Sequence, residues 1–288
     1  MTNSVQMVFW DVQHGHATYI KSPNGRHIVI DLGTGDYSGK NTNFSPLLYL
    51  KNYYYVNQLD YVIITHPHLD HIDDILHFDL LSPKVLTYPK LITNERLLKE
   101  VREQDRPKYE EYCSICNRYN QPVTQYDNPD NSDNYGGLKI LRFIPSFYDG
   151  DNLNNYSIVI VLEYAGVKVV IPGDNERGCL EELMKNESFN NAVANADILL
   201  APHHGRESAY NNDFVNLVKP RLSVVSDGKY CDTSANGRYS EKSRGWTVFK
   251  SGEPIKRKCL TTNSDGEIYV KFGYDVSTGE SFLEVKVK

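Results

Sequence analysis

The chain has 288 residues, of which 40% are hydrophobic and 24% are charged, with 31 lysines and arginines against 37 aspartates and glutamates. This composition is typical of a folded protein and excludes wholesale disorder. The formal net charge of −6 provides no global attraction to nucleic acid, so a polyanion would need a local basic patch.

Cysteine usage and hydrophobic runs bear on the compartment of the protein. The five cysteines are an odd number scattered along a long chain, unlike the disulfide framework of a small secreted domain. The sequence contains no apolar run of about 18 residues and no basic stretch followed by an apolar one at its start. We therefore expect a cytoplasmic protein without a membrane span or signal peptide, and the sequence leaves its oligomeric state unknown.

The first part of the chain predicts a meander of strands, then a helix and a buried strand. Short β-prone runs alternate with turn residues such as Gly15 and Gly25. Residues 61–64 form an apolar run of the kind found in a buried strand. The expected strands are 5–10, 17–21, 27–31 and 61–64, and the expected helix is 45–54.

The rest of the chain alternates helices and strands without a repeat, low-complexity tract or linker, which favours one domain. Residues 95–120 contain Pro107, which predicts one broken helix or two helices. Composition predicts loops at 127–137 and from 227 to about 245. The expected strands are 138–144, 157–163, 167–171, 197–201, 222–226, 267–272 and 282–287, and the expected helices are 180–186 and 213–218.

Potential metal ligands follow the predicted strand at 61–64. His66, His68, Asp70 and His71 lie within six residues, where a turn or helix start would direct several of them into one pocket. Imidazoles and carboxylates suit zinc, iron or manganese. A solvent-exposed turn has no stability reason to collect them, and two further sets of candidate ligands follow later predicted strands.

These motifs resemble those of a known superfamily. Residues 65–71, Thr-His-Pro-His-Leu-Asp-His, resemble the HxHxDH signature of the metallo-β-lactamase superfamily. Residues 169–174 resemble its later strand-Gly-Asp element, and residues 201–205 resemble its last histidine motif. The order and spacing of the three motifs match across the chain.

A closer resemblance is to the hydrolase domain of the ComEC/Rec2 competence proteins, in a free-standing form without the membrane channel. The opening segment Asp-Val-Gln-His-Gly-His at 11–16 is similar to that family's DVGQGD element. The other similar segments are 22–25, 30–33, 154–157, 203–205 and 260–268. Together they span almost the whole chain.

The resemblance implies an αββα sandwich, two mixed β-sheets flanked by helices, as a single domain over residues 1–288. It also implies two divalent metal ions, zinc or manganese. His66 and His68 would hold the first ion, Asp70 and His71 the second, and Asp174 would bridge the two.

Three further roles follow from the resemblance. The last histidine ligand is His203 or His204, and His204 aligns better because Gly205 follows it directly. Asp31 would orient a ligand imidazole, as such carboxylates commonly do. His14 lies in a glycine-containing turn and would face the metal pocket if that turn folds as in the relatives; otherwise it is an ordinary turn residue.

One departure from the family concerns the first metal position. Ordinary two-zinc members have a ligand histidine before the bridging aspartate, but His77 alone lies between His71 and Asp174, and it comes too soon. Asn154 and Asn155 stand at that place. The first position is therefore short of one nitrogen ligand, so we expect the second metal to be held more tightly and an asparagine oxygen to favour manganese at the first.

A second departure follows Ser226, where the competence-type pattern carries a Tyr-Gly-His-Pro element. This chain has Asp227, Lys229 and Tyr230 there, which form either a rebuilt substrate pocket or only a loop. Lys229, or a nearby arginine, would then stabilise negative charge on the leaving group.

Two other patterns have simple explanations. Cys113 and Cys116 have the one-turn spacing of a helix, which explains them more easily than a zinc knuckle. A basic run is either a polyanion patch or a solvated face, and its members are Lys242, Arg244, Lys250, Lys256, Arg257 and Lys258.

The resulting hypothesis is a metal-dependent hydrolase that uses metal-activated water, a metal-bound hydroxide, to attack a phosphodiester in a nucleic acid or nucleotide. Asp70 would orient the water, and Asp174 would hold both cations. One alternative is an ester, thioester or lactone hydrolase, because a fold alone does not choose the substrate. The other is a metal-binding regulatory module without catalysis.

Overall fold

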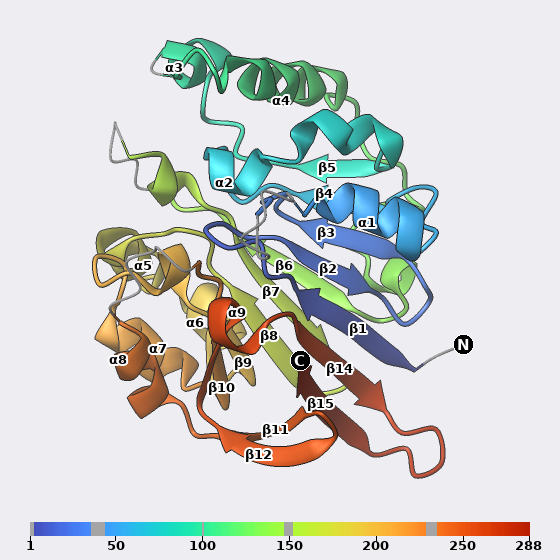
Figure 1. Ribbon diagram of the computed structural model, residues 1–288, viewed down its shortest axis with the longest axis vertical. Coiled ribbons are helices and arrows are strands. Elements are labelled where there is room, and N and C mark those ends of the chain that lie inside the picture. The colour runs from blue at the N-terminus through green and yellow to red at the C-terminus, as the bar shows by residue number, and fades with distance from the viewer. Residues whose placement is uncertain (1–2, 36–43, 100, 147–151, 229–234) are drawn as a thin grey trace.

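Two β-sheets pack face to face, and helices cover their outer surfaces (Figure 1). The computed structural model describes residues 3–35, 44–99, 101–146, 152–228 and 235–288. This arrangement confirms the predicted αββα sandwich with two mixed sheets. No helix in the described ranges is long and apolar enough to cross a bilayer.

The first sheet has nine strands within the described residues, in the order β12-β11-β15-β14-β1-β2-β3-β4-β5. Strands β3, β4 and β5 are parallel to one another. The bounds are β1 Ser4–Phe9, β2 Thr18–Lys21, β3 His27–Ile30, β4 Tyr61–Ile63, β5 Val85–Thr87, β11 Trp246–Lys250, β12 Glu253–Arg257, β14 Ile268–Tyr274 and β15 Ser281–Val287.

The second sheet has six strands in the part of the chain that is described, in the order β13-β10-β9-β8-β7-β6. Strands β8, β9, β10 and β13 are parallel, whereas β6 and β7 are antiparallel to their neighbours. The bounds are β6 Lys139–Phe143, β7 Val159–Tyr164, β8 Val167–Ile171, β9 Ile198–Leu200, β10 Leu222–Val225 and β13 Cys259–Thr261.

Side chains along a strand point alternately to the two faces of its sheet, and this alternation forms the layers. In β1, Val5, Met7 and Phe9 face the core between the sheets, while Val8 packs toward the helices. The helices over the first sheet are α1 Pro46–Tyr53, α2 Leu69–Ile72, α3 Asn94–Lys99 and α4 Arg106–Arg118; those over the second are α5 Arg177–Leu183, α6 Glu187–Val193, α7 Asn212–Val218 and α8 Asn236–Lys242. The short elements are α9 Thr262–Asp265 and the 3₁₀ helices η1 Ile75–Leu80, η2 Ser132–Tyr135, η3 Leu153–Tyr156 and η4 Pro202–Gly205.

Most expected elements form, but some expectations were wrong. The predicted loop from 227 to 245 contains α8, and the predicted loop at 127–137 contains η2. Strands β5, β11, β12 and β13 and helix α6 were not anticipated. β5 and β13 have three residues each, and β12 is an exposed edge strand, so none of these three shows a clear hydrophobic pattern. Residues 95–120 form two helices, and Pro107 lies in the first turn of α4.

The core between the sheets provides a test of this architecture. Leu162 on β7 is fully buried in that core, whereas Leu141 on the adjacent β6 is exposed. We expect Leu162→Ala to lower the free energy of unfolding by about 2–5 kcal/mol, because it removes buried methyl groups and leaves a cavity. Leu141→Ala should change it by less than about 0.5 kcal/mol. Chemical denaturation measures both, and equal losses would contradict the assignment of the two faces.

Candidate metal centre

The candidate ligands all follow strand ends, and these ends meet at one edge of the sandwich. In the first sheet, β4 leads into His66 and His68, and α2 then presents Asp70 and His71. In the second sheet, β8 leads into Asp174, and β9 leads into η4 with its two histidines. The two sheets therefore contribute candidate ligands to one centre.

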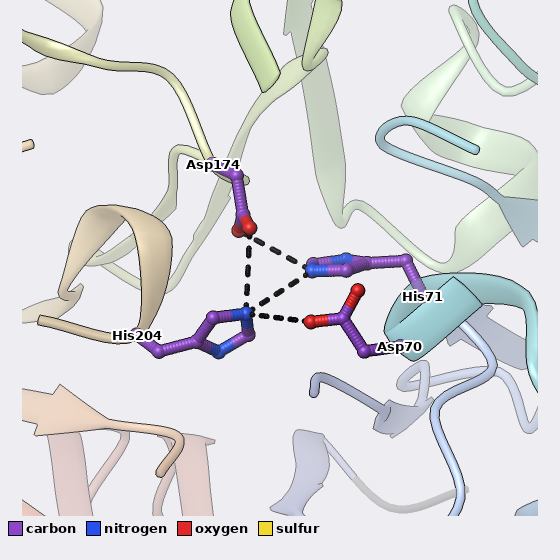
Figure 2. A group of neighbouring side chains, drawn as sticks. All are labelled: Asp70, His71, Asp174 and His204. Carbon is purple, nitrogen blue, oxygen red and sulfur yellow. Dashed lines mark hydrogen bonds and ion pairs between the residues drawn. The ribbon is translucent and has the colours of Figure 1, made fainter. Parts of the chain in front are cut away.

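Four side chains converge most closely, as Figure 2 shows. Nε2 of His71 lies 3.3 Å from Oδ1 of Asp174, and Nε2 of His204 lies 3.3 Å from Oδ2 of the same carboxylate. Nε2 of His204 also lies 3.2 Å from Oδ2 of Asp70 and 3.4 Å from Nε2 of His71. The four donor atoms lie within 4.8 Å of one another. Two imidazoles and two carboxylates in this arrangement fit a divalent cation such as zinc or manganese.

Hydrogen bonds leave Nε2 of both histidines available to a cation. Nδ1 of His71 donates to the carboxylate of Asp31 over 2.8 Å, and Nδ1 of His204 donates to the carbonyl of Ser226 over 2.9 Å. Because a carboxylate and a carbonyl only accept, the proton sits on Nδ1 of each neutral ring. Asp31 thus has the position expected of a residue that orients a ligand imidazole.

The buried carboxylates favour positive charge on the groups around them. Burial raises the pKa of Asp174, but His204 and His71 outweigh it and hold that pKa well below its ordinary value. Burial lowers the pKa of His71, but Asp174 and Asp31 outweigh it and raise that pKa well above its ordinary value. Burial also lowers the pKa of His204, but Asp174 and Asp70 outweigh it and raise that pKa to about 9. Either protons on these imidazoles or a divalent cation bound among the same groups would balance the negative charge of the carboxylates.

The remaining predicted ligands form a looser group beside these four. Nε2 of His66 lies 3.1 Å from Nδ1 of His68 and 3.7 Å from Oδ2 of Asp174. Oδ1 of Asn154 is buried and makes no hydrogen bond of ordinary geometry with a described residue. Its side chain contributes to raising the pKa of His68, against the larger lowering by burial. This amide lies beside His68, at the place where the resemblance predicts another ligand.

Other candidates are engaged elsewhere. Asn155 accepts a hydrogen bond from the backbone of Glu176, and Nδ1 of His77 lies 2.7 Å from Asp74. Buried His16 contacts Asp31 and Thr18 through its two ring nitrogens, at 3.0 and 2.7 Å. Neither His16 nor His77 is therefore positioned to supply the missing nitrogen. Cys113 and Cys116 are buried on α4 and belong to no cluster of potential metal ligands in the described ranges.

Two further histidines, His14 and His203, lie at the rim of the four converging side chains; His203 is buried and His14 is exposed. Nε2 of His14 lies 3.3 Å from Oδ2 of Asp70, and its side chain is 42% exposed. Nε2 of His203 lies 3.8 Å from Oδ2 of Asp174 and 3.2 Å from Nη1 of Arg206. The geometry therefore favours His204 over His203 as the last ligand. Sequence reasoning did not single out Arg206, although it directly follows the His-His-Gly motif.

The loop after Ser226 lies only partly within the described residues. Lys229 and Tyr230 are outside them. Asp227 is buried, its backbone exchanges hydrogen bonds with the Thr262 hydroxyl, and Oδ1 accepts from the backbone of Asn263. Asp227 therefore anchors this loop to α9.

Residues at and next to the candidate ligands have unusual backbone conformations. His203 and His204 have φ of 48° and 54°, which places both in the left-handed region that non-glycine residues seldom adopt. Gly173, before Asp174, has φ of 61°, and a Cβ there would lie 2.7 Å from Cβ of Ser157. Ser157 Oγ in turn accepts a hydrogen bond from the backbone of Asp174 over 3.0 Å. Such strain is retained at sites where the surroundings determine the geometry.

The chain is similar to several known proteins. A family model described as metallo-beta-lactamase superfamily matches residues 10–226. ComE operon protein 3 of Bacillus subtilis is 27% identical over 289 residues, which cover 93% of this chain and 33% of that protein. A UPF0173 protein of Pyrococcus abyssi is 23% identical over 257 residues, with coverages of 85% and 97%. Transcription termination factor FttA of Methanosarcina mazei is 39% identical over 197 residues, with coverages of 62% and 30%.

These matches confirm the resemblance inferred from the motifs, including the one to competence proteins. The chain spans about a third of the length of ComE operon protein 3 and of the termination factor. What those whole proteins do is therefore not transferred by the matches alone.

The two adjacent histidines provide a test of the centre. We expect His204→Ala to weaken zinc binding by at least about 100-fold, since loss of a residue that only supports a ligand already costs about 10–100-fold. His203→Ala should weaken it by less than about tenfold. Isothermal titration of metal-free protein measures both, with circular dichroism as the check on folding. The opposite ranking would make His203 the ligand.

Proposed function

The chain belongs to the metallo-β-lactamase superfamily as a metal-dependent hydrolase, and we propose that it hydrolyses phosphodiester bonds in a nucleic acid or a nucleotide. The observation that carries the proposal is the guanidinium of Arg206 at the rim of the centre, 3.2 Å from Nε2 of His203. A cation at this place suits an anionic diester, whereas a neutral ester or lactone has no charge for it to neutralise.

The chain offers two positions for cations. Asp70, His71, Asp174 and His204 would hold one ion, and His66 and His68 with a share of Asp174 would hold the other. Bound divalent cations act as Lewis acids toward a phosphoryl oxygen and lower the pKa of water from about 15.7 toward 7. The Asp70 carboxylate lies 3.3 Å from Nε2 of His14. It would accept a hydrogen bond from the attacking water and orient it.

We assign to Arg206 the role that the sequence suggested for Lys229 or a nearby arginine. Its Nε is buried and makes no hydrogen bond with a described residue. Its charge also contributes to lowering the pKa of His14 and His203, after the larger lowering by burial and by His204. Its contact with Nε2 of His203 places the guanidinium beside the centre. It can therefore donate to a diester oxygen beside the metal positions.

The basic run between 242 and 258 contributes less charge than its sequence suggests. Arg257 forms a bidentate pair with Asp265, at 2.8 and 2.9 Å, and Arg244 donates to the carbonyl of Ala196. These two arginines stabilise the fold. We therefore propose that a nucleic-acid substrate is engaged mainly at the rim of the metal centre. A relative named as a transcription termination factor supports this substrate class.

A substrate panel tests the proposed reaction. Wild-type protein with Mn²⁺ should hydrolyse bis(p-nitrophenyl) phosphate and short oligonucleotides faster than p-nitrophenyl acetate, a thioester or a lactone. Asp174→Ala should abolish turnover because its carboxylate serves both metal positions. Arg206→Gln should lower kcat/KM for the diesters by about tenfold or more, and leave it nearly unchanged for the neutral ester, because a charged hydrogen bond is lost only with the anion.

The other outcomes identify the alternatives. A higher kcat/KM for the acetate, thioester or lactone than for any diester would make the protein an ester, thioester or lactone hydrolase. Full metal loading with no turnover of any substrate would indicate a regulatory module. Turnover by Asp174→Ala in the presence of a chelator would refute the metal-dependent mechanism.

We also propose that the two metal positions are unequal. The second has four donor atoms within 4.8 Å of one another, whereas the first has two imidazoles, a carboxylate oxygen at 3.7 Å and the amide of Asn154. Purified protein should hold about one metal ion firmly, and added Mn²⁺ should raise activity more than added Zn²⁺, because the oxygen donor favours the harder ion. Elemental analysis before and after dialysis, followed by titration of each ion, gives the answer. Two equally firm zinc ions with full activity would show that another group completes the first position.

A further inference from the structure

A cavity of about 420 Å³ lies between β5 and β6, the edge strands of the two sheets. Its wall on the first sheet is β5 and the following segment to Leu91. Its wall on the second sheet includes Arg142 of β6, Ile144 just after that strand, and Tyr156 of η3. Val123 and neighbouring loop residues close the remaining side. A volume of this size lies within the usual range of ligand sites, roughly 300–1,000 Å³.

The cavity adjoins the metal centre. The carbonyl of Thr87, in its wall, accepts a hydrogen bond from Ile64, two residues before ligand candidate His66. Tyr156, in the opposite wall, is two residues after Asn154 in the same 3₁₀ helix. Ile158 donates to the carbonyl of Thr65 over 3.0 Å, which joins the two walls at the strand ends. These links bring both walls of the cavity close to candidate ligands of the metal centre.

The rim of the cavity is unusually apolar for a surface. Leu91, Val123 and Ile144 line it with exposed fractions of 55%, 46% and 52%. Single exposed apolar side chains need no explanation, but three around one concave site are typical of a surface that covers a ligand. The Arg96 guanidinium, over the Tyr156 ring at 5.2 Å, stiffens the wall at this point.

Charge at the cavity favours one class of ligand. Lys90 lines it and forms no ion pair with another described residue, whereas Arg142 is paired with Asp130. A neutral acyl group would fill the apolar part but leave the Lys90 ammonium without a partner. A nucleotide uses both, because its flat base packs between apolar side chains while its phosphate meets the ammonium group. The outward backbone groups of the two edge strands add hydrogen-bonding partners for the edge of a base.

We propose that this cavity is a nucleobase subsite, which binds the base next to the scissile phosphodiester while Lys90 contacts a flanking phosphate. The inference rests on the proposed function and deepens it, since it specifies a nucleotide substrate. It assigns the apolar rim to recognition and leaves the metal ligands to the reaction.

Equilibrium binding to the full chain tests the subsite separately from catalysis. With EDTA present to exclude phosphate binding at the metals, adenosine 5′-monophosphate should bind at least tenfold more tightly than ribose 5-phosphate or octanoate, measured by isothermal titration. Ile144→Asp should weaken nucleotide binding at least tenfold. Leu76→Asp is the matched control, because Leu76 is equally exposed, at 55%, and lies outside the cavity on η1. Lys90→Gln should weaken binding of the nucleotide more than binding of adenosine.

Val123→Asp serves as a second cavity variant if Ile144→Asp fails to fold by circular dichroism. Equal binding of the nucleotide and ribose 5-phosphate, tighter binding of octanoate, or the same effect of the Leu76 control and the cavity variants would each overturn the subsite. Diester hydrolysis without nucleotide binding in the cavity would refute this inference alone. Nucleotide binding without diester hydrolysis would refute the proposed reaction and leave the subsite standing.

Discussion

The carboxylate of Asp31 is the constraint on which the centre depends. It accepts four hydrogen bonds, from the backbone and hydroxyl of Thr65, from His71 and from His16. A fully buried charge is costly unless it is hydrogen-bonded in this way, so the four donors are fixed together. Asp31 itself has φ of 57°, an unfavourable conformation that these bonds hold in place. One residue thus joins the ends of β3 and β4 and sets the ring orientation of a candidate ligand.

The second sheet is fastened to the same network from its own strand ends. Ser226, just after β10, accepts from His204 through its carbonyl and donates from its hydroxyl to the carbonyl of Gly15 in the first sheet's loop. The backbone of His203 donates to the carbonyl of Gly173, which ties the ends of β8 and β9. Because candidate ligands come from both sheets, cation binding and the packing of the sandwich would stabilise each other.

The convergence of the candidate ligands could be predicted from the sequence because their signals are local. Apolar runs predicted β4, β8 and β9, and each is followed by the polar residues that the structure brings together. The sequence did not decide between His203 and His204. The directions of these two side chains depend on two consecutive residues in the left-handed region, which the sequence pattern does not predict. Arg206 and the cavity were missed because they depend on tertiary placement. β5 has only three residues, and its neighbour across the cavity, β6, is distant in the chain.

The order of the strands relates the proposed diester hydrolysis to the proposed nucleobase subsite. At the edge of the second sheet where the candidate centre lies, Arg206 follows β9 and η4, Asp174 follows β8, Asn154 precedes β7 and Ile144 follows β6. A cation, the metal positions, an amide and an apolar cavity therefore follow one another in space. A diester with its phosphorus at the metals would have one oxygen toward Arg206 and its base toward β6. The acidic chain would then attract an anionic substrate only along this line, because the metals, Arg206 and Lys90 act locally against an unfavourable net charge.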